Sequence, residues 1–230
     1  MRLSDKERNH TKQLLPIVLF AACVLHVHAA TINFGSDVPG TVPKGWSVFM
    51  THQGGAPKWE VITDRTAPSK KGYVVGQTSK DQTDGRFPLL IYDNSNLKDG
   101  EVSVAFKAIS GRVDQGAGLV WRFKDLNNYY VTRANALEDN VVLYKVEAGT
   151  RFSIAPKGLP SRSYGVKHEV PSARWSTLKV VFKDSLFTVF LNGERLFETE
   201  DETFEETGKV GLWTKADSLT YFADFTFVKQ

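Results

Sequence analysis

The sequence predicts an all-β protein, built as an antiparallel sandwich or barrel, and three observations carry this prediction. Apolar and polar residues alternate with a period of two along many short runs, which is typical of strands with one buried face. Turn-forming residues separate consecutive runs by only a few positions. No segment shows an apolar stripe at helical spacing, so many short antiparallel strands are the expected architecture.

The clearest strand lies at residues 101–109, where Val102, Val104, Phe106 and Ala108 fall on one face. Shorter strand candidates precede it, at residues 58–63, 73–77 and 89–92. Further candidates follow it, at residues 117–123, 128–135, 140–147, 150–155, 176–183, 186–191, 209–214 and 219–228.

The middle of the chain is expected to form consecutive hairpins, with turns at residues 124–127, 138–139, 148–149 and 192–193. Asn192-Gly193 is the strongest of these signals, because both residues tolerate the positive φ of a type I′ turn. Folding the chain about the turns predicts four cross-strand pairs: Trp121 with Tyr130, Arg122 with Tyr129, Tyr130 with Lys145, and Asn135 with Asn140. Since a slip of one residue exchanges the two faces, which face is core stays open.

Composition excludes several classes of protein. The 230 residues contain 29 Lys and Arg against 26 Asp and Glu, 12% aromatic residues and one Cys. Such a chain is not a disordered tail, a collagen or a disulfide scaffold. Its near-neutral charge gives no reason to expect a nucleic-acid partner.

Residues 1–29 are predicted to be a secretory signal peptide, which leaves residues 30–230 as one domain. A basic stretch to Lys12 precedes an apolar run from Leu14 to Leu25, and Val27-His28-Ala29 fits a cleavage site. We therefore expect a secreted or periplasmic protein with no membrane span in the mature chain. Two alternatives stay open: a lipoprotein anchored through Cys23, and a retained membrane anchor.

The central hairpins resemble a known group of domains. The stretch at residues 114–135, continued by residues 140–146, is similar to secreted bacterial proteins of the concanavalin A-like lectin/glucanase superfamily. It looks most like the laminin-G-like and 3-keto-disaccharide hydrolase group, and the segments 175–180, 187–193, 208–214 and 221–227 match the way such domains end. The resemblance spans about residues 31–228 and implies an antiparallel two-sheet jelly-roll sandwich. It implies no single chemistry, because this fold hosts lectins, hydrolases and inert modules.

No catalytic or metal-binding constellation stands out. The acidic run containing Glu198, Glu200 and Glu202 lacks the pattern of a glycosidase carboxylate pair and is interpreted as a solvated surface loop. His52 and His168 are far apart in a domain without cysteine, which argues against a triad and against zinc. No cofactor is expected, although calcium bound by loop oxygens at residues 93–99 or 125–128 is left open.

Recognition of a saccharide is the favoured chemistry, because aromatic rings cover the C–H faces of sugars while planar polar groups match their hydroxyls. An arginine inside a sheet needs a carboxylate or a ligand as partner, so Arg122 and Arg133 are informative. The alternative is that the tryptophans are core and both arginines pair with acids. The predicted ligand-binding residues are Trp121, Arg122, Tyr130, Arg133, Asn135, Asn140, Lys145 and Trp213.

The predicted function is thus a secreted saccharide-binding jelly-roll module. The resemblance implies a second hypothesis, a glycoside-cleaving lyase acting on 3-keto-disaccharides with one general base and one electrostatic stabiliser. Its candidate bases are Glu138, Asp139 and Glu147, and its candidate stabilisers are Arg122 and Arg133. A third hypothesis is an adhesive or structural laminin-G-like domain. Under either of the first two, Arg122→Ala and Arg133→Ala are expected to weaken activity with little loss of folding.

Overall fold

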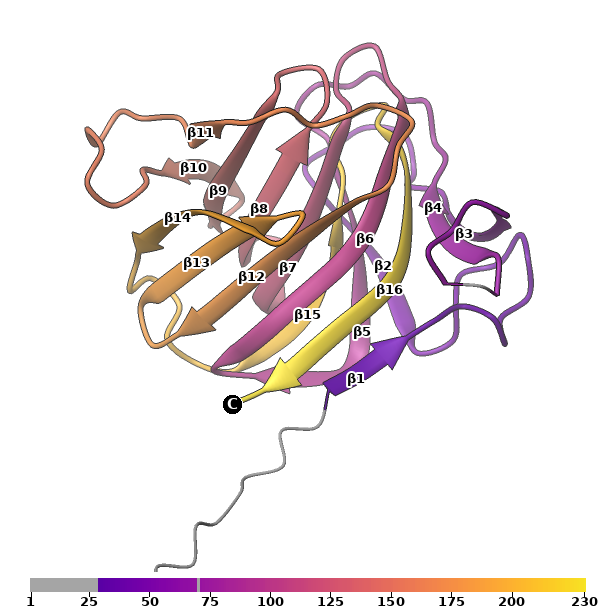
Figure 1. Cartoon of the computed structure of the whole chain (residues 1–230), viewed down its shortest axis with the longest axis horizontal. Coiled ribbons are helices and arrows are strands. Elements are labelled where there is room, and N and C mark those ends of the chain that lie inside the picture. Colours follow the sequence, from indigo (N-terminus) through magenta and orange to yellow (C-terminus); the bar gives the residue numbers. More distant parts are fainter. Residues whose placement is uncertain (1–28, 70) are drawn as a thin grey trace, which may run out of the picture.

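A computed structural model of the chain describes residues 29–69 and 71–230, and in this part it is built from strands and turns with no helix. The predicted all-β fold is confirmed (Figure 1). The strands, in chain order, are β1 (Ala29–Ile32), β2 (Trp46–Thr51), β3 (Trp59–Thr63), β4 (Tyr73–Gln77), β5 (Phe87–Leu97), β6 (Gly100–Ser110), β7 (Gly116–Asp125), β8 (Asn128–Asn135), β9 (Asn140–Glu147), β10 (Thr150–Ile154), β11 (Val166–Lys167), β12 (Ser176–Lys183), β13 (Leu186–Leu191), β14 (Glu194–Glu200), β15 (Gly208–Trp213) and β16 (Leu219–Lys229).

Two antiparallel sheets pack face to face as a sandwich (Figure 1). Sheet A has the strand order β14-β13-β12-β6-β16-β4-β3, with β1 paired to β16. Sheet B has the order β10-β9-β8-β7-β15-β5-β2, with β11 paired to β9. Strands distant in sequence are neighbours in both sheets, as β6 and β16 are, and this is the jelly-roll arrangement that the resemblance implies.

The predicted hairpin register is confirmed at three of its four pairs. Trp121 lies opposite Tyr130, Tyr130 opposite Lys145, and Asn135 opposite Asn140. The short turns between these strands fix the pairing, since loop length sets the register of a hairpin.

The fourth predicted pair, Arg122 with Tyr129, is wrong because β7 carries a bulge. The register of β7 against β8 shifts between Trp121 and Asp125, and Arg122 has a φ of 47°, in the left-handed region. Gly208 of β15 allows the bulge to pack, since a Cβ there would lie 2.5 Å from the Arg122 carbonyl carbon. A bulge re-aims side chains, and here it turns Arg122 away from its neighbours on the strand.

Sheet B is buried on both faces. Its inner face, with Leu119, Trp121, Tyr130 and Leu143, joins residues of sheet A in the core between the sheets. Its outer face carries a second apolar cluster drawn from sheet B alone, which includes Val120, Val131, Tyr144 and Trp213. Two buried faces explain why alternation along these strands did not distinguish core from surface.

The acidic run that was interpreted as a surface loop is instead partly an edge strand. β14 buries Phe197 and Thr199, while Glu198 and Glu200 point outward and pair with Arg195 and Lys157. The alternation of this strand is masked by its charged residues, which are typical of sheet edges.

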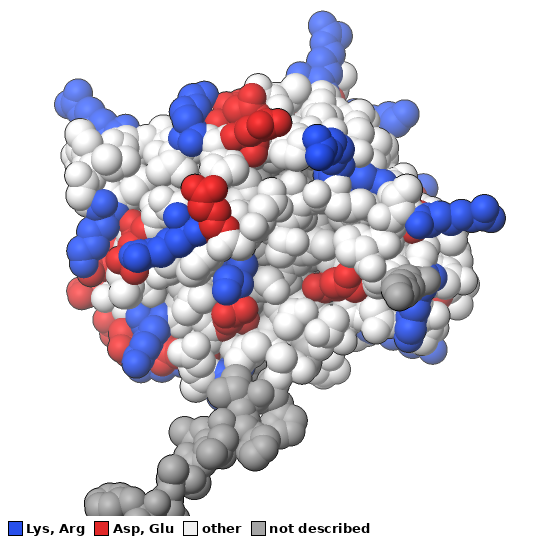
Figure 2. All heavy atoms as spheres, in the orientation of Figure 1, with Lys and Arg blue, Asp and Glu red and all other residues white. Residues whose placement is uncertain are grey.

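The face covered by sheet A carries basic and acidic side chains interspersed, with uncharged surface between them (Figure 2). The predicted signal peptide lies outside the described residues, apart from Ala29, the first residue of β1. None of the residues described forms a helix that is long and apolar enough to cross a membrane.

Candidate functional site

The structure places seven of the eight predicted site residues on opposite faces of sheet B, three inside and four outside, while Arg122 lies at one end of the sandwich. Trp121 and Tyr130 lie between the sheets, where their rings stack with a centroid distance of 5.4 Å. Both side chains are fully buried, so neither ring can lie against a sugar. Their predicted role as ligand-binding residues is not supported, because their face of the hairpin is the core. The Tyr130 hydroxyl instead donates to Asp201 Oδ1 at 2.6 Å.

Arg122 is fully buried at one end of the sandwich and has a structural set of partners. Nε donates to Lys98 O at 2.9 Å, Nη1 to Phe204 O at 2.7 Å, and Nη2 to Asp184 O at 2.6 Å. Nη2 also lies 3.3 Å from Asp99 Oδ1. The predicted ligand role is not supported, since the guanidinium is occupied in holding together three separate segments of the chain.

Lys145 lies on the inner side of sheet B and does not reach the outer face. Its ammonium donates to Thr203 Oγ1 at 2.7 Å and lies 3.3 Å from Glu147 and 3.5 Å from Asp201. Lys145 is therefore part of the polar edge beside Tyr130, apart from the remaining predicted residues.

The other four predicted residues, Arg133, Asn135, Asn140 and Trp213, come together on the outer face of sheet B. Arg133 on β8 and Trp213 on β15 both pair with Gly118 of the intervening strand β7, so the three form one row across the sheet. Gly118 leaves room for the Trp213 ring, because a Cβ at Gly118 would lie 3.1 Å from Trp213 Cβ and Cε3.

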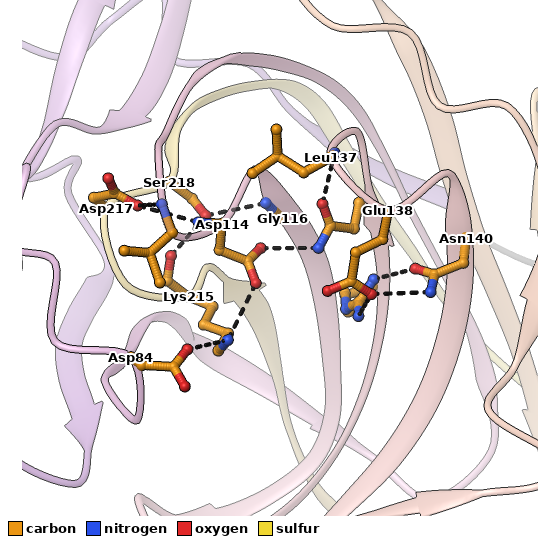
Figure 3. Close-up of polar contacts among 12 residues, drawn as sticks. Asp84, Asp114, Gly116, Leu137, Glu138, Asn140, Lys215, Asp217 and Ser218 are labelled. Carbon is orange, nitrogen blue, oxygen red and sulfur yellow. Dashed lines mark hydrogen bonds and ion pairs between the residues drawn. The ribbon is translucent and has the colours of Figure 1, made fainter.

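Arg133 is the centre of a cluster that we call the Arg133 hub, formed by Arg133, Glu138, Asn140, Tyr144 and Tyr164. Figure 3 shows the side chains of Glu138 and Asn140, which are two of its members. Nη1 of Arg133 donates to Asn140 Oδ1 at 2.5 Å, and Nη2 donates to Glu138 Oε2 at 2.8 Å and to Tyr164 OH at 3.3 Å. The same carboxylate oxygen accepts from Asn140 Nδ2 at 2.9 Å. The hydroxyls of Tyr144 and Tyr164 are 2.5 Å apart. Cation, carboxylate and amide are thus held in one rigid arrangement.

A second polar chain adjoins the hub. Asp114 accepts from Asn135 Nδ2 at 3.2 Å and lies 3.4 Å from Lys215 Nζ, which in turn pairs with Asp84 at 2.5 Å (Figure 3). The carboxylate of Asp217 accepts backbone N–H groups of residues 112–114 and so fixes the loop that carries Asp114.

Electrostatics favour the charged form of the hub. Burial disfavours charge on Arg133, but the surrounding Tyr144, Glu138 and Asp114 outweigh it and raise the Arg133 pKa. Burial works to raise the pKa of Glu138, yet the Arg133 guanidinium and Asn140 amide hold it below its ordinary 4.5. Burial does raise the pKa of Asp114, in spite of Arg133 and Lys215. A nearly buried carboxyl with a raised pKa beside two cations occurs at functional sites as well as in structural ion-pair networks.

Part of this site is exposed to solvent and part is buried in the protein. Arg133 and Asn140 are buried, whereas the Glu138 side chain is 42% exposed and Tyr164 is 47% exposed. A ligand approaching from solvent would meet a carboxylate and a phenol whose positions are set by buried partners. The site combines hydrogen-bond donors, acceptors and aromatic surface, which suits a polyhydroxylated molecule.

The predicted set of ligand-binding residues leaves out Asp114, Tyr164 and Lys215, and Glu138 is predicted only as a candidate base. Glu138 lies in the tight turn between β8 and β9, beside two predicted residues, and that adjacency is a usable signal. Tyr164 reaches the hub from the segment after β10, and nothing in its local sequence indicates this.

The structure places no cluster of three or more His, Cys, Asp or Glu side chains suited to a metal ion within the described residues. At one of the two proposed calcium loops, Asp125 accepts from Asn127 N and Asn128 Nδ2, as in an ordinary turn.

Comparison with known proteins gives a family match over most of the chain. The model of the 3-keto-alpha-glucoside-1,2-lyase-like domain matches residues 36–227, while no curated protein matches. Among solved structures, the carbohydrate-binding module CBM66 from Bacillus subtilis has 22% identity and a TM-score of 0.58, covering 80% of this chain and 96% of that one. Domain 4 of AbnA, a GH43 extracellular arabinanase from Geobacillus stearothermophilus solved with arabinotriose, has 11% identity and a TM-score of 0.53, covering 88% and 93%. These structures share the fold of this chain.

Proposed function

Because this chain belongs to the 3-keto-alpha-glucoside-1,2-lyase-like domain family, we propose that its function is to bind a saccharide at the Arg133 hub. The observation that carries the proposal is the hub itself. A buried guanidinium fixes a half-exposed carboxylate and a half-exposed phenol at the surface of sheet B. CBM66 and the arabinotriose-bound domain of AbnA, which share the fold, give independent support.

The chemistry of the hub matches neighbouring hydroxyls of a sugar ring. Glu138 has one carboxylate oxygen occupied by Arg133 and Asn140, which leaves Oε1 to accept from a hydroxyl. Tyr164 offers a hydroxyl and an exposed ring edge or face. Because buried partners hold these groups in place, little ordering entropy is lost on binding.

A glycan array and calorimetry with the full chain test this proposal. Glu138→Ala should weaken binding of any array ligand by at least about tenfold, the equivalent of about 1.4 kcal/mol. Glu169→Ala is the matched control, because Glu169 is an exposed acid outside the hub. Unchanged binding in Glu138→Ala, with the fold intact by circular dichroism, would show that the binding site lies elsewhere.

A second candidate function is the elimination reaction that the family name describes. Of the three candidate bases, Glu138 alone is hydrogen-bonded to one of the candidate stabilisers, since Asp139 accepts from Val170 N and Glu147 pairs with Lys145. In a 3-keto-glucoside the C2–H is acidified by the C3 ketone. Glu138 would take that proton, and the C–H electrons would form an enolate across C2, C3 and the ketone oxygen, which Arg133 would stabilise. When the ketone is restored, the C1=C2 bond would form, the C1–O bond would break, and the departing oxygen would take the proton back from Glu138.

The low pKa of Glu138 favours binding over this reaction, because an effective base has a pKa near the working pH. Incubation with a 3-keto-α-glucoside, followed by detection of the released alcohol or sugar, separates the two functions. A lyase would show turnover that falls about 100-fold or more in Glu138→Gln. Binding without turnover would mean that the domain acts as a binding module and not as a lyase.

We further propose that the domain acts outside the cytoplasm, on the strength of the signal-like pattern of residues 1–29. Expression from the native start codon and sequencing of the mature N-terminus test this. A terminus near residue 30 supports secretion, one at Cys23 indicates a lipoprotein, and an intact leader contradicts cleavage.

A further inference from the structure

Arg151 is a charged residue on the outer face of sheet B that the proposed function does not use. It lies in the edge strand β10, opposite Val146 of β9. Its side chain reaches across the outer face, and its Cζ lies 4.7 Å from the Phe87 ring centroid, 4.5 Å from that of Tyr144 and 5.9 Å from that of Trp213. The guanidinium is therefore enclosed by three aromatic rings.

Arg151 is partly exposed, and its partners differ from those of the buried arginines Arg86, Arg122 and Arg133. Arg86 donates to three backbone carbonyls, Arg122 to three carbonyls, and Arg133 to Asn140 and Glu138. Among the described residues, Arg151 has neither a salt bridge nor a side-chain hydrogen bond. Its Nη1 is buried without an acceptor, as is Nε of Arg133. Aromatic faces attract a cation but accept its N–H groups only weakly. A buried donor without an acceptor is rare in native proteins.

The carboxylates on the outer face of sheet B form ion pairs with other cations. Asp84 and Asp114 both pair with Lys215, and Glu138 pairs with Arg133. The pKa of Asp84 is lowered first by Lys215 and only to a lesser degree by the more distant charge of Arg151. Among the described residues, Arg151 is thus a cation of this face without a carboxylate partner, as is the exposed Lys167, whose ammonium donates to the backbone oxygen of Glu138.

Arg151 and the hub share an aromatic neighbour. The centroid of the Tyr144 ring lies 4.5 Å from Arg151 Cζ and 5.9 Å from Arg133 Cζ. Both guanidinium groups therefore contact one ring, and an oligosaccharide bound at Glu138 and Tyr164 can extend to Arg151.

We infer that Arg151 binds the carboxylate of an acidic saccharide, so that the ligand class of the site is a uronic-acid-containing glycan. This inference rests on the proposed function and specifies its ligand. Two N–H groups of a guanidinium match the two oxygens of a planar carboxylate, and the neighbouring aromatic rings hold the partly exposed guanidinium in place for that pairing. A sulfate ester would offer the same charge with a tetrahedral arrangement of oxygens.

Calorimetry with matched ligands tests the inference. The probes are oligogalacturonates and glucuronate-containing oligosaccharides, each paired with its neutral methyl ester, together with a sulfated oligosaccharide. We expect each uronic-acid oligosaccharide that binds to do so at least tenfold more tightly than its methyl ester. This difference in affinity should become smaller as the salt concentration is raised. Arg151→Gln should abolish the difference and leave ester binding unchanged. Arg151→Lys should keep part of it, and Arg174→Gln, which alters an exposed arginine, should keep all of it.

The outcomes separate this inference from the function on which it rests. Equal affinity for acid and ester, or binding of neutral glycans alone, overturns the acidic ligand and keeps saccharide binding. Tighter binding of the sulfated oligosaccharide than of the uronic acid and its ester overturns the assignment of Arg151 to a carboxylate. Binding of no glycan, with the fold intact, overturns both.

Discussion

Replacing Arg122 should destabilise the fold, which is a different outcome from the loss of binding expected for a ligand residue. Arg122→Met keeps much of the aliphatic stem but removes the donors to Lys98 O, Asp184 O and Phe204 O. These carbonyls belong to the β5–β6 turn, the β12–β13 turn and the segment before β15, so the guanidinium ties three connections together at one end of the sandwich.

The size of the effect follows from the groups left unpaired. Each buried acceptor that loses its donor costs about 1–3 kcal/mol, and removing one partner from a buried charged network typically costs about 3–5 kcal/mol in total. We expect a loss of about 4 kcal/mol, which is a large part of the 5–15 kcal/mol that stabilises a typical domain. For a domain of this size the melting temperature should fall by about 8–16 °C.

Urea unfolding followed by tryptophan fluorescence measures this loss, because Trp121 lies in the core close to Arg122. Arg174→Met is the control and should change the free energy of unfolding by less than about 0.5 kcal/mol, as exposed substitutions usually do. A loss below about 1 kcal/mol in Arg122→Met would refute the structural role of this residue. Saccharide affinity per folded molecule should be unchanged.

Three further substitutions test the outer face. Burial raises the pKa of Asp114 above 3.8, so the protonated carboxyl contributes stability below about pH 4 that is lost as pH rises through the raised pKa. In urea titrations, the free energy of unfolding of Asp114→Asn should therefore increase relative to that of wild type as pH rises above about 4, and a constant difference would contradict this. Gly118→Ala pushes a Cβ against Trp213 and should cost about 1–3 kcal/mol in thermal unfolding, whereas a neutral change would mean that the ring is free to shift. Tyr164→Phe removes the hydroxyl of a half-exposed residue that contacts Arg133. Calorimetry should show weaker saccharide binding, with a change in the free energy of unfolding below about 1 kcal/mol. Equal binding would show that Tyr164 is not part of the site.

The sheet-forming part of the fold could be predicted because the information is local. Alternation and short turns determine the pairs between β7, β8 and β9, and three of the four predicted pairs are correct. The bulge at Arg122 depends on its contact with Gly208 of β15, far along the sequence, so local patterns do not reveal it.

The candidate site was harder to predict because it depends on two features that the local sequence pattern does not indicate. The first is that both faces of sheet B are buried, so Trp121 and Tyr130 could not be distinguished from Arg133 and Trp213 by burial pattern. The second is that loops complete the hub: Tyr164 arrives from the segment after β10. Residue types predicted a polar, aromatic site on these strands, and the face on which it lies had to come from the structure.

Chemical-shift mapping of the backbone amides during a saccharide titration tests the central claim most directly. The best-binding glycan from the array is titrated into the isotopically labelled full chain. We expect the largest shifts at residues 137–140, at Tyr164 and at Lys215, which surround the outer face of sheet B. Shifts confined to the groove between Pro156–Leu159 and Arg195–Glu198, at the opposed edges of the two sheets, would contradict the account.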